Sequence, residues 1–158
     1  MTTTLRPGSA RSRLPPPPPS ATAVELEIPF HHADVLGIAW HGHYPKYLDL
    51  ARTALLRARR LDVEDLRGLG FRFVVSESFL HHDSPLRYGD RVRVTAWLGE
   101  VENRLEIAYQ LRNLGTGALA AEGWTVLVTT RADGTLCLET PPEILGRLRV
   151  PGPPPRSP

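Results

Sequence analysis

The chain has 158 residues, with 19 Lys and Arg against 17 Asp and Glu and a formal net charge of +2 at pH 7. This length allows one domain with a single core, and so small an excess of positive charge gives no support to nucleic-acid binding. The single cysteine, Cys137, excludes an intrachain disulfide and the cysteine-rich zinc motifs, so we expect a cytoplasmic protein. No apolar run approaches the roughly 20 residues that cross a bilayer.

Proline-rich segments occupy both ends of the sequence. Residues 1–23 contain no acidic residue and carry consecutive prolines at 15–19, a composition that favours disorder with a polyproline II stretch. These prolines argue against an organelle transit peptide, which needs an amphipathic helix. Residues 149–158 are also proline-rich, and we expect them to be disordered. The folded domain should therefore span residues 24–148.

Two periodic patterns begin this domain. Apolar residues at 24, 26, 28 and 30 alternate with glutamate or proline, which predicts a half-buried strand. Apolar residues then recur at helical spacing, which predicts a long helix over residues 44–60. Pro45 fits its first turn, where a missing N–H costs no hydrogen bond, and arginines at its end complement the helix dipole. The loop between strand and helix carries Asp34 to the positive end of that helix.

The rest of the domain consists mostly of strands joined by short turns. The expected elements are a helical turn at 62–70, strands at 71–79, 91–98, 104–112, 124–129 and 136–138, and a small helix at 141–148. One helix and one sheet must cover each other's apolar faces. We therefore expect an α+β fold in which an antiparallel sheet of about five to six strands wraps round one long helix. The exposed edge strands of such a sheet predict pairing of subunits edge to edge.

The loop and the helix together carry a recognisable motif. Asp34 is followed by Gly37 three positions later and by His41 seven positions later. The helix continues the pattern with Tyr44, Tyr47, Leu48, Ala51 and Arg52. This arrangement resembles the signature of the hotdog-fold acyl-CoA thioesterases of the 4-hydroxybenzoyl-CoA thioesterase and YbgC-like family, over about residues 24–128.

The chain departs from that family pattern at two places. Many members carry a second acid two positions before the residue aligned with Asp34, and this chain has His32 there. Asparagine or a small residue is common where this chain has Gly42 and His43.

The resemblance implies a catalytic role for Asp34 and His41. Asp34 would act as general base on water or as nucleophile towards the thioester carbonyl, and the residues alone leave both routes open. An aspartate held only by backbone N–H groups is the structural alternative. We expect the apolar neighbours of Asp34, among them Val35 and Leu36, to exclude water partly. His41 would contribute its main-chain N–H, in a group of free amides at 41–44, to an oxyanion.

Further residues are candidates for substrate binding. Gly37 permits a tight turn or a close approach of the ligand. Trp40 and Tyr44 flank the helix start, although a place in the core also explains Tyr44. Arg104 and Arg131 are candidates for the coenzyme A phosphates, and solvated arginines on a strand are the alternative.

The six histidines fall into three groups, at 31–32, 41 and 43, and 81–82. With Asp34 or Asp83 they offer a metal site as an alternative. Adjacent histidines on a strand point to opposite faces and the resembled family uses no metal, so we expect no cofactor. The resemblance implies an acyl-CoA or acyl-carrier-protein thioester as substrate and a homodimer or homotetramer as the assembly. A non-catalytic acyl-CoA-binding hotdog protein is the alternative from another class.

Overall fold

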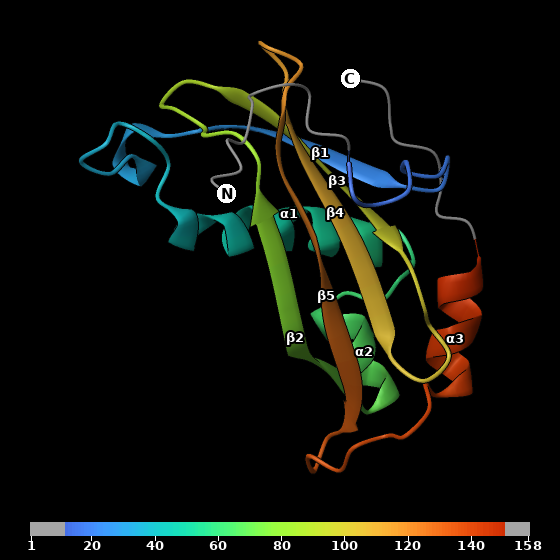
Figure 1. Ribbon diagram of the computed structural model, residues 1–158. Coiled ribbons are helices and arrows are strands. Elements are labelled where there is room, and N and C mark those ends of the chain that lie inside the picture. Colours follow the sequence, from blue (N-terminus) through green and yellow to red (C-terminus); the bar gives the residue numbers. More distant parts are fainter. Residues whose placement is uncertain (1–11, 151–158) are drawn as a thin grey trace, which may run out of the picture.

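The structure, a computed structural model, describes residues 12–150. In chain order its elements are β1 (Thr22–Glu27), the 3₁₀ turns η1 (Phe30–His32) and η2 (His41–His43), α1 (Tyr44–Arg57), α2 (Val63–Leu69), β2 (Phe71–His82), β3 (Arg91–Leu98), β4 (Leu105–Asn113), β5 (Leu119–Arg131) and α3 (Pro142–Arg149). The strands form a five-stranded antiparallel sheet in the order β1-β3-β4-β5-β2. The sheet curves over α1, with α2 and α3 towards its lower end in Figure 1. The predicted α+β fold with a sheet wrapped round one long helix is confirmed.

Helix α1 supplies one half of the core. Tyr47, Leu48, Ala51 and Leu55 repeat at helical spacing and are at most 2% exposed. The opposite half consists of every second residue of β3 and β4, because strand side chains alternate between faces. These inward residues are Val92, Val94, Ala96, Ile107, Tyr109 and Leu111, all fully buried. Both halves belong to one contiguous cluster, which fixes the start of α1 relative to the sheet.

We expect Leu55→Ala to lower the free energy of unfolding by about 2–5 kcal/mol, because it leaves a cavity at the centre of this core. Urea denaturation followed by fluorescence and circular dichroism measures the change. Leu50→Ala is the matched control on the same helix, because Leu50 is 53% exposed, and it should cost less than about 1 kcal/mol. Equal losses in the two variants would contradict the described packing.

Two predicted elements differ from the structure. The helix predicted over residues 44–60 ends at Arg57. The chain reverses there because Arg60 takes a left-handed φ of 56°, which lets Leu61 pack into the core at 1% exposure. The strand predicted at 136–138 is wrong, since the segment makes only an isolated bridge between Thr130 and Leu136. Leu136 and Leu138 are 52% and 83% exposed, so of this segment only Cys137 packs against the core.

Strand β1 begins at Thr22, two residues before the expected start of the domain, because Thr22 and Ala23 pair with β3. The last strand also extends beyond the predicted 124–129, to Leu119–Arg131. The expected tails include residues 1–11 and 151–158, which lie outside the described residues.

Residues 12–21 precede β1 and reach the face of the sheet that points away from α1. The Ser12 hydroxyl donates to one carboxylate oxygen of Glu122, and the Arg13 amide donates to the other, each at 2.5 Å. Glu122 lies on β5 and is only 2% exposed. These donors stabilise a buried charge, which is costly without hydrogen bonds, and they hold the proline-rich segment against the sheet.

Strand β2 forms one edge of the sheet, where it pairs with β5 alone. Its exposed apolar side chains include Val74 at 47%, Val75 at 44% and Phe79 at 44%. A long apolar edge strand presents unpaired N–H and C=O groups that can pair with another strand. This edge ends at His82, beside the loop that carries Asp34.

Candidate functional site

Asp34 lies in a tight turn between β1 and α1. The Gly37 amide donates to its carbonyl and its own amide donates to the Ile38 carbonyl, both at 2.9 Å. Gly37 has a φ of 74°, a conformation that favours glycine, so the predicted tight turn is confirmed. The Asp34 Oδ1 atom accepts a hydrogen bond from the Leu36 amide at 2.8 Å. Its Oδ2 atom has no hydrogen-bond partner within residues 12–150, which leaves that oxygen available to a ligand.

Two of the apolar neighbours predicted to shield Asp34, Val35 and Leu36, do not shield it within a single chain. Val35 is 102% exposed and Leu36 is 71% exposed, because both lie at the tip of the turn. Ile38 and Ala39 turn inward instead, where the Ala39 amide donates to the Leu86 carbonyl at 2.7 Å. The turn therefore has a packed inner face, at Ile38 and Ala39, and an uncovered outer face, at Val35 and Leu36, which another subunit could contact.

The chain enters α1 through the short turn η2. Four backbone amides, at 41–44, were predicted to be free. Two of them are not, because the His43 amide donates to the Trp40 carbonyl and the Tyr44 amide donates to the His41 carbonyl. The amides of His41 and Gly42 have no hydrogen-bond partner within the described residues. Trp40 is 49% exposed and covers Gly42 so closely that any side chain at 42 would collide with the indole. The open amides thus lie where a helix start attracts negative charge.

A cavity of about 370 Å³ joins the Asp34 turn to the helix start. Its walls are formed by Asp34, Leu36, Ile38, Ala39, His41, Tyr44, His82, Asp83, Ser84 and Pro85. The structure therefore brings together three residues predicted for the site, Asp34, His41 and Tyr44. Tyr44 is also a core residue, at 3% exposure.

The far wall of this cavity consists of residues that the sequence analysis did not assign to it. His82 ends β2, and its ring lies 4.5 Å from the Tyr44 ring in an edge-on arrangement. Desolvation, followed by the positive charges of His41 and His81, lowers the pKa of His82. His82 is therefore neutral near pH 7 and available to accept a proton.

Asp83 and Ser84 continue that wall. One carboxylate oxygen of Asp83 lies 3.4 Å from the His81 ring, and the Ser84 hydroxyl donates to the Leu119 carbonyl at 2.7 Å. The only sequence signal for this wall was the run of histidines and an aspartate at 81–83. Its placement depends on the pairing of β2 with β5, which links residues far apart in the chain.

The predicted phosphate-binding arginines lie elsewhere in the chain. Arg104 follows the turn between β3 and β4 and pairs with Glu100 at 3.4 Å. Arg131 ends β5, where its guanidinium lies 5.6 Å from the centre of the Phe71 ring. Phe71 and His82 are opposite ends of β2, so neither arginine reaches the cavity of its own chain.

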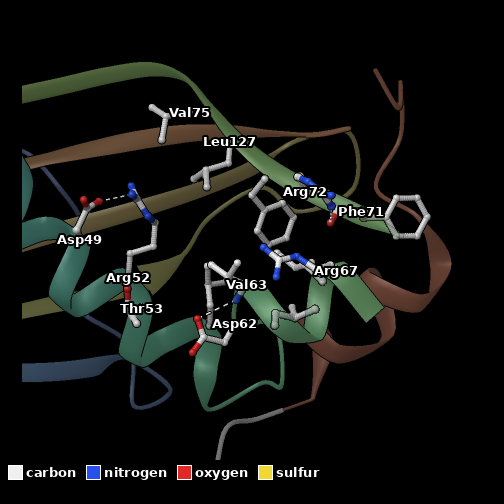
Figure 2. A pocket seen from close by; sticks show the side chains of 14 residues that line it. Asp49, Arg52, Thr53, Asp62, Val63, Arg67, Phe71, Arg72, Val75 and Leu127 are labelled. Carbon is white, nitrogen blue, oxygen red and sulfur yellow. Dashed lines mark hydrogen bonds and ion pairs between the residues drawn. The ribbon is translucent and has the colours of Figure 1, made fainter. Parts of the chain in front are cut away.

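A second cavity, of about 320 Å³, opens between α1, α2 and β2. Figure 2 shows Arg52 and Asp49 of α1 on one side of it and Phe71 and Arg72 of β2 on another. Arg52 is ion-paired with Asp49. Apolar side chains of α2 and β5 complete the lining. This cavity lies at the Phe71 end of β2, away from Asp34 of the same chain.

Within residues 12–150, no three His, Cys, Asp or Glu side chains are arranged to hold a metal ion. In the same part of the chain, no helix is long and apolar enough to cross a membrane.

Residues 28–148 match the family described as the Thioesterase-like superfamily. The Synechocystis protein named "Putative esterase sll0410" is 32% identical over 123 residues, which cover 77% of this chain and 74% of that protein. A hypothetical protein of Thermus thermophilus has a TM-score of 0.74 at 27% identity, covering 82% of this chain and 98% of its own. A 1,4-dihydroxy-2-naphthoyl-CoA thioesterase of Synechocystis shares the fold, with a TM-score of 0.72 at 15% identity over 81% of this chain and 95% of its own.

The matched range contains the Asp34 turn, the whole of α1 and all strands of the sheet except β1. The cavity that joins Asp34 to the helix start lies entirely within it. The chain belongs to the thioesterase-like superfamily, has the hotdog fold, and is a thioester hydrolase.

Proposed function

We propose that the protein hydrolyses acyl-CoA thioesters in the cavity between the Asp34 turn and the start of α1. The observation that carries this proposal is the cavity that Asp34, with one unpartnered carboxylate oxygen, shares with His41, whose amide is open like that of the next residue, Gly42. A carboxylate can activate water or attack a carbonyl, and fixed amides stabilise the oxyanion that results. A hydrolase of this kind requires both groups on one cavity.

In the hydrolytic route, Asp34 takes a proton from water as the water oxygen bonds to the carbonyl carbon. The carbonyl oxygen becomes negative and accepts hydrogen bonds from the His41 and Gly42 amides. The carbon–sulfur bond then breaks, and the coenzyme A sulfur leaves as a thiol with the proton that Asp34 returns. In the covalent route Asp34 attacks the carbonyl carbon and the carbon–sulfur bond breaks, which releases the coenzyme A thiolate and leaves an anhydride on Asp34. Water then cleaves this anhydride to the free acid and the Asp34 carboxylate, and the proton that water loses goes to the thiolate. Both routes give a free acid and free coenzyme A.

The complete site is proposed to form between two subunits that pair through β2. Support comes from the exposed apolar edge of β2 and from the uncovered side chains of Val35 and Leu36. A two-fold axis near the middle of β2 would bring the Phe71 end of the partner strand to the His82 end of the first. The partner's second cavity and its copy of Arg131 would then approach the reacting carbonyl. A tetramer would be a pair of such dimers.

Arg87 is a further candidate to bind the coenzyme A phosphates. Its backbone forms a β-bridge with Ile38 of the same chain, beside the Asp34 turn. Its side chain is exposed and makes no ion pair within residues 12–150, so it is available to a phosphate.

We place the reaction in the cytoplasm, which fits a chain with one cysteine.

Release of free thiol, followed with a thiol-reactive dye, tests this function. Short-chain, long-chain and aromatic acyl-CoA thioesters are compared with the same acyl groups on an acyl carrier protein. We expect thiol release from at least one CoA ester at a higher kcat/KM than from its carrier-protein counterpart. Faster turnover of the carrier-protein esters would change the substrate class. Saturable binding of CoA esters with no thiol release from any of them would overturn the proposed hydrolysis of acyl-CoA.

A further inference from the structure

A pair of stacked imidazoles links the Asp34 turn to α1. The rings of His32, in η1, and His43, in η2, are nearly parallel at 13°, with their centres 4.0 Å apart. The Nδ1 atom of His32 lies 2.7 Å from the hydroxyl of Tyr47, which belongs to the first turns of α1. His32 also accepts a backbone hydrogen bond from the Trp40 amide at 2.9 Å. The pair therefore joins the two ends of the loop that contains Asp34, at positions 32 and 43.

The stacked pair holds together the two segments that carry the groups of the proposed reaction, the Asp34 turn and the start of α1. Asp34 lies two residues after His32, and the open amides of His41 and Gly42 lie just before His43. If the pair separates, the carboxylate and the amides are no longer held at a fixed spacing. A small displacement of such groups costs much of the rate because the reacting atoms must stay aligned.

The surroundings of the pair disfavour a proton on either Nδ1 atom. Tyr47 is 2% exposed, and burial raises its pKa to about 12, so its hydroxyl stays protonated and can donate to His32 Nδ1 when that nitrogen carries no proton. The Nδ1 atom of His43 is buried without a hydrogen-bond partner in the described residues. A proton on that atom would therefore be an unsatisfied buried donor, which is costly.

The environment of His32 also favours its neutral form. Desolvation, followed by the positive charges of His43, His31 and Lys46, lowers the pKa of His32. His31 lies edge-on to His32 at 4.6 Å, and Trp40 lies edge-on to His43 at 5.5 Å. The helix start at Tyr44 adds its positive dipole end. Within residues 12–150 no carboxylate is hydrogen-bonded or ion-paired to either ring.

We propose that His32 and His43 are positioning residues whose stacked rings hold Asp34 and the helix-start amides in register, and that protonation of His32 releases the loop. The direction with pH follows from linkage. While the stack is formed, the pKa of His32 is lowered; once the stack separates, His32 binds protons more tightly and titrates near the ordinary value of about 6.5. The stacked form of the loop is therefore fully stabilised above that pH and loses stability as the pH falls below it.

The proposal rests on the proposed hydrolysis only for its kinetic readout. The first experiment is kinetic and compares wild type with the double variant His32→Phe/His43→Phe, which keeps two stacked rings without a titrating group. In wild type we expect kcat to fall about tenfold per pH unit below its acid midpoint. In the double variant we expect a change of less than about threefold between pH 7.5 and 5.5, because neither ring of the pair can then be protonated.

His31→Asn is the matched control, because His31 is the exposed neighbour of His32 in the same turn. It should keep the steep acid limb, with the midpoint moved slightly upward because one positive neighbour of His32 is gone. An unchanged acid limb in the double variant would overturn the proposal and assign the titration to another cavity group such as His82.

A second experiment uses the wild-type protein alone and needs no catalysis. The ring proton signals of His32 are followed by NMR while hydrogen exchange is measured at the amides of 33–40, corrected for the intrinsic pH dependence of exchange. We expect faster corrected exchange with a midpoint that coincides with the His32 titration. Protection that stays constant across that titration would overturn the positioning role of the His32–His43 pair even if the protein proved to be an active thioesterase. Coincident midpoints in a protein without acyl-CoA thioesterase activity would keep that positioning role and overturn only the proposed function.

Discussion

Asp34→Asn should lower kcat for thioester hydrolysis by about 100- to 10,000-fold, the usual contribution of a general base or nucleophile. The amide oxygen of asparagine can still accept the hydrogen bond that the Leu36 amide donates at 2.8 Å, so the turn should keep its shape. The charge that activates water or attacks the carbonyl is lost. KM should change little, because the lost interaction acts in the transition state. Steady-state thiol release measures both constants.

Asp133→Asn is the matched control for this substitution. Asp133 accepts a hydrogen bond from the Thr135 amide two residues later, at 2.9 Å, in the same local geometry as Asp34 and Leu36. It lies in the exposed turn after β5, away from the cavity. The control should therefore keep wild-type turnover. If Asp34→Asn also stayed within about threefold of wild type, the carboxylate would have only a structural role in its turn.

Val75→Asp should break the proposed subunit pairing and the activity together. Val75 is 44% exposed on the β2 edge, and a two-fold axis near the middle of the strand would place its two copies close together. Like charges at an interface cost several kcal/mol, so the dimer dissociation constant should rise at least about 100-fold. Sedimentation velocity over a range of concentrations measures this change. The monomer should be inactive because its cavity lacks the partner's wall.

Leu138→Asp is the control for adding a carboxylate at an exposed apolar position. Leu138 is 83% exposed in the segment after β5 and is not part of the β2 strand. This variant should keep the wild-type assembly and turnover. A Val75→Asp protein that dimerised with wild-type affinity would place the interface elsewhere, and a fully active monomer would show that one chain holds a complete site.

The local parts of the structure were predictable because they depend on neighbouring residues. The helix start at Tyr44 followed from Pro45 and the spacing of apolar residues, and the tight turn followed from Gly37. Asp62 begins the helical turn predicted at 62–70, and its side chain caps α2 by accepting a hydrogen bond from the Val63 amide at 2.8 Å. In each case the deciding interaction spans only a few residues.

The nonlocal parts were not predictable in the same way. His82 and Asp83 reach the cavity only because β2 pairs with β5 in a register that places His82 opposite Ala121. The same register carries Arg131 to the opposite end of β2, beside Phe71. A strand pattern gives the face on which a side chain lies, but it does not give the neighbour strand. The assignment of Arg131 to the same site therefore needs a second subunit.

The His32–His43 pair shows a limit of a different kind. The sequence analysis noted His32 as a departure from the family pattern and treated the histidines as a metal alternative. The stack depends on the precise path of two short turns, η1 and η2, that bring residues 32 and 43 together. Side-chain spacing in the sequence does not specify that path.

The most direct measurement is a crystal structure of the protein with an acyl-CoA analogue in which a ketone methylene replaces the thioester sulfur. We expect the ketone oxygen at about 3 Å from the main-chain nitrogens of His41 and Gly42. We also expect the carbonyl carbon to face the Asp34 carboxylate, directly or across one water. An analogue whose ketone lies outside this cavity, out of reach of both the amides and Asp34, would contradict the central claim.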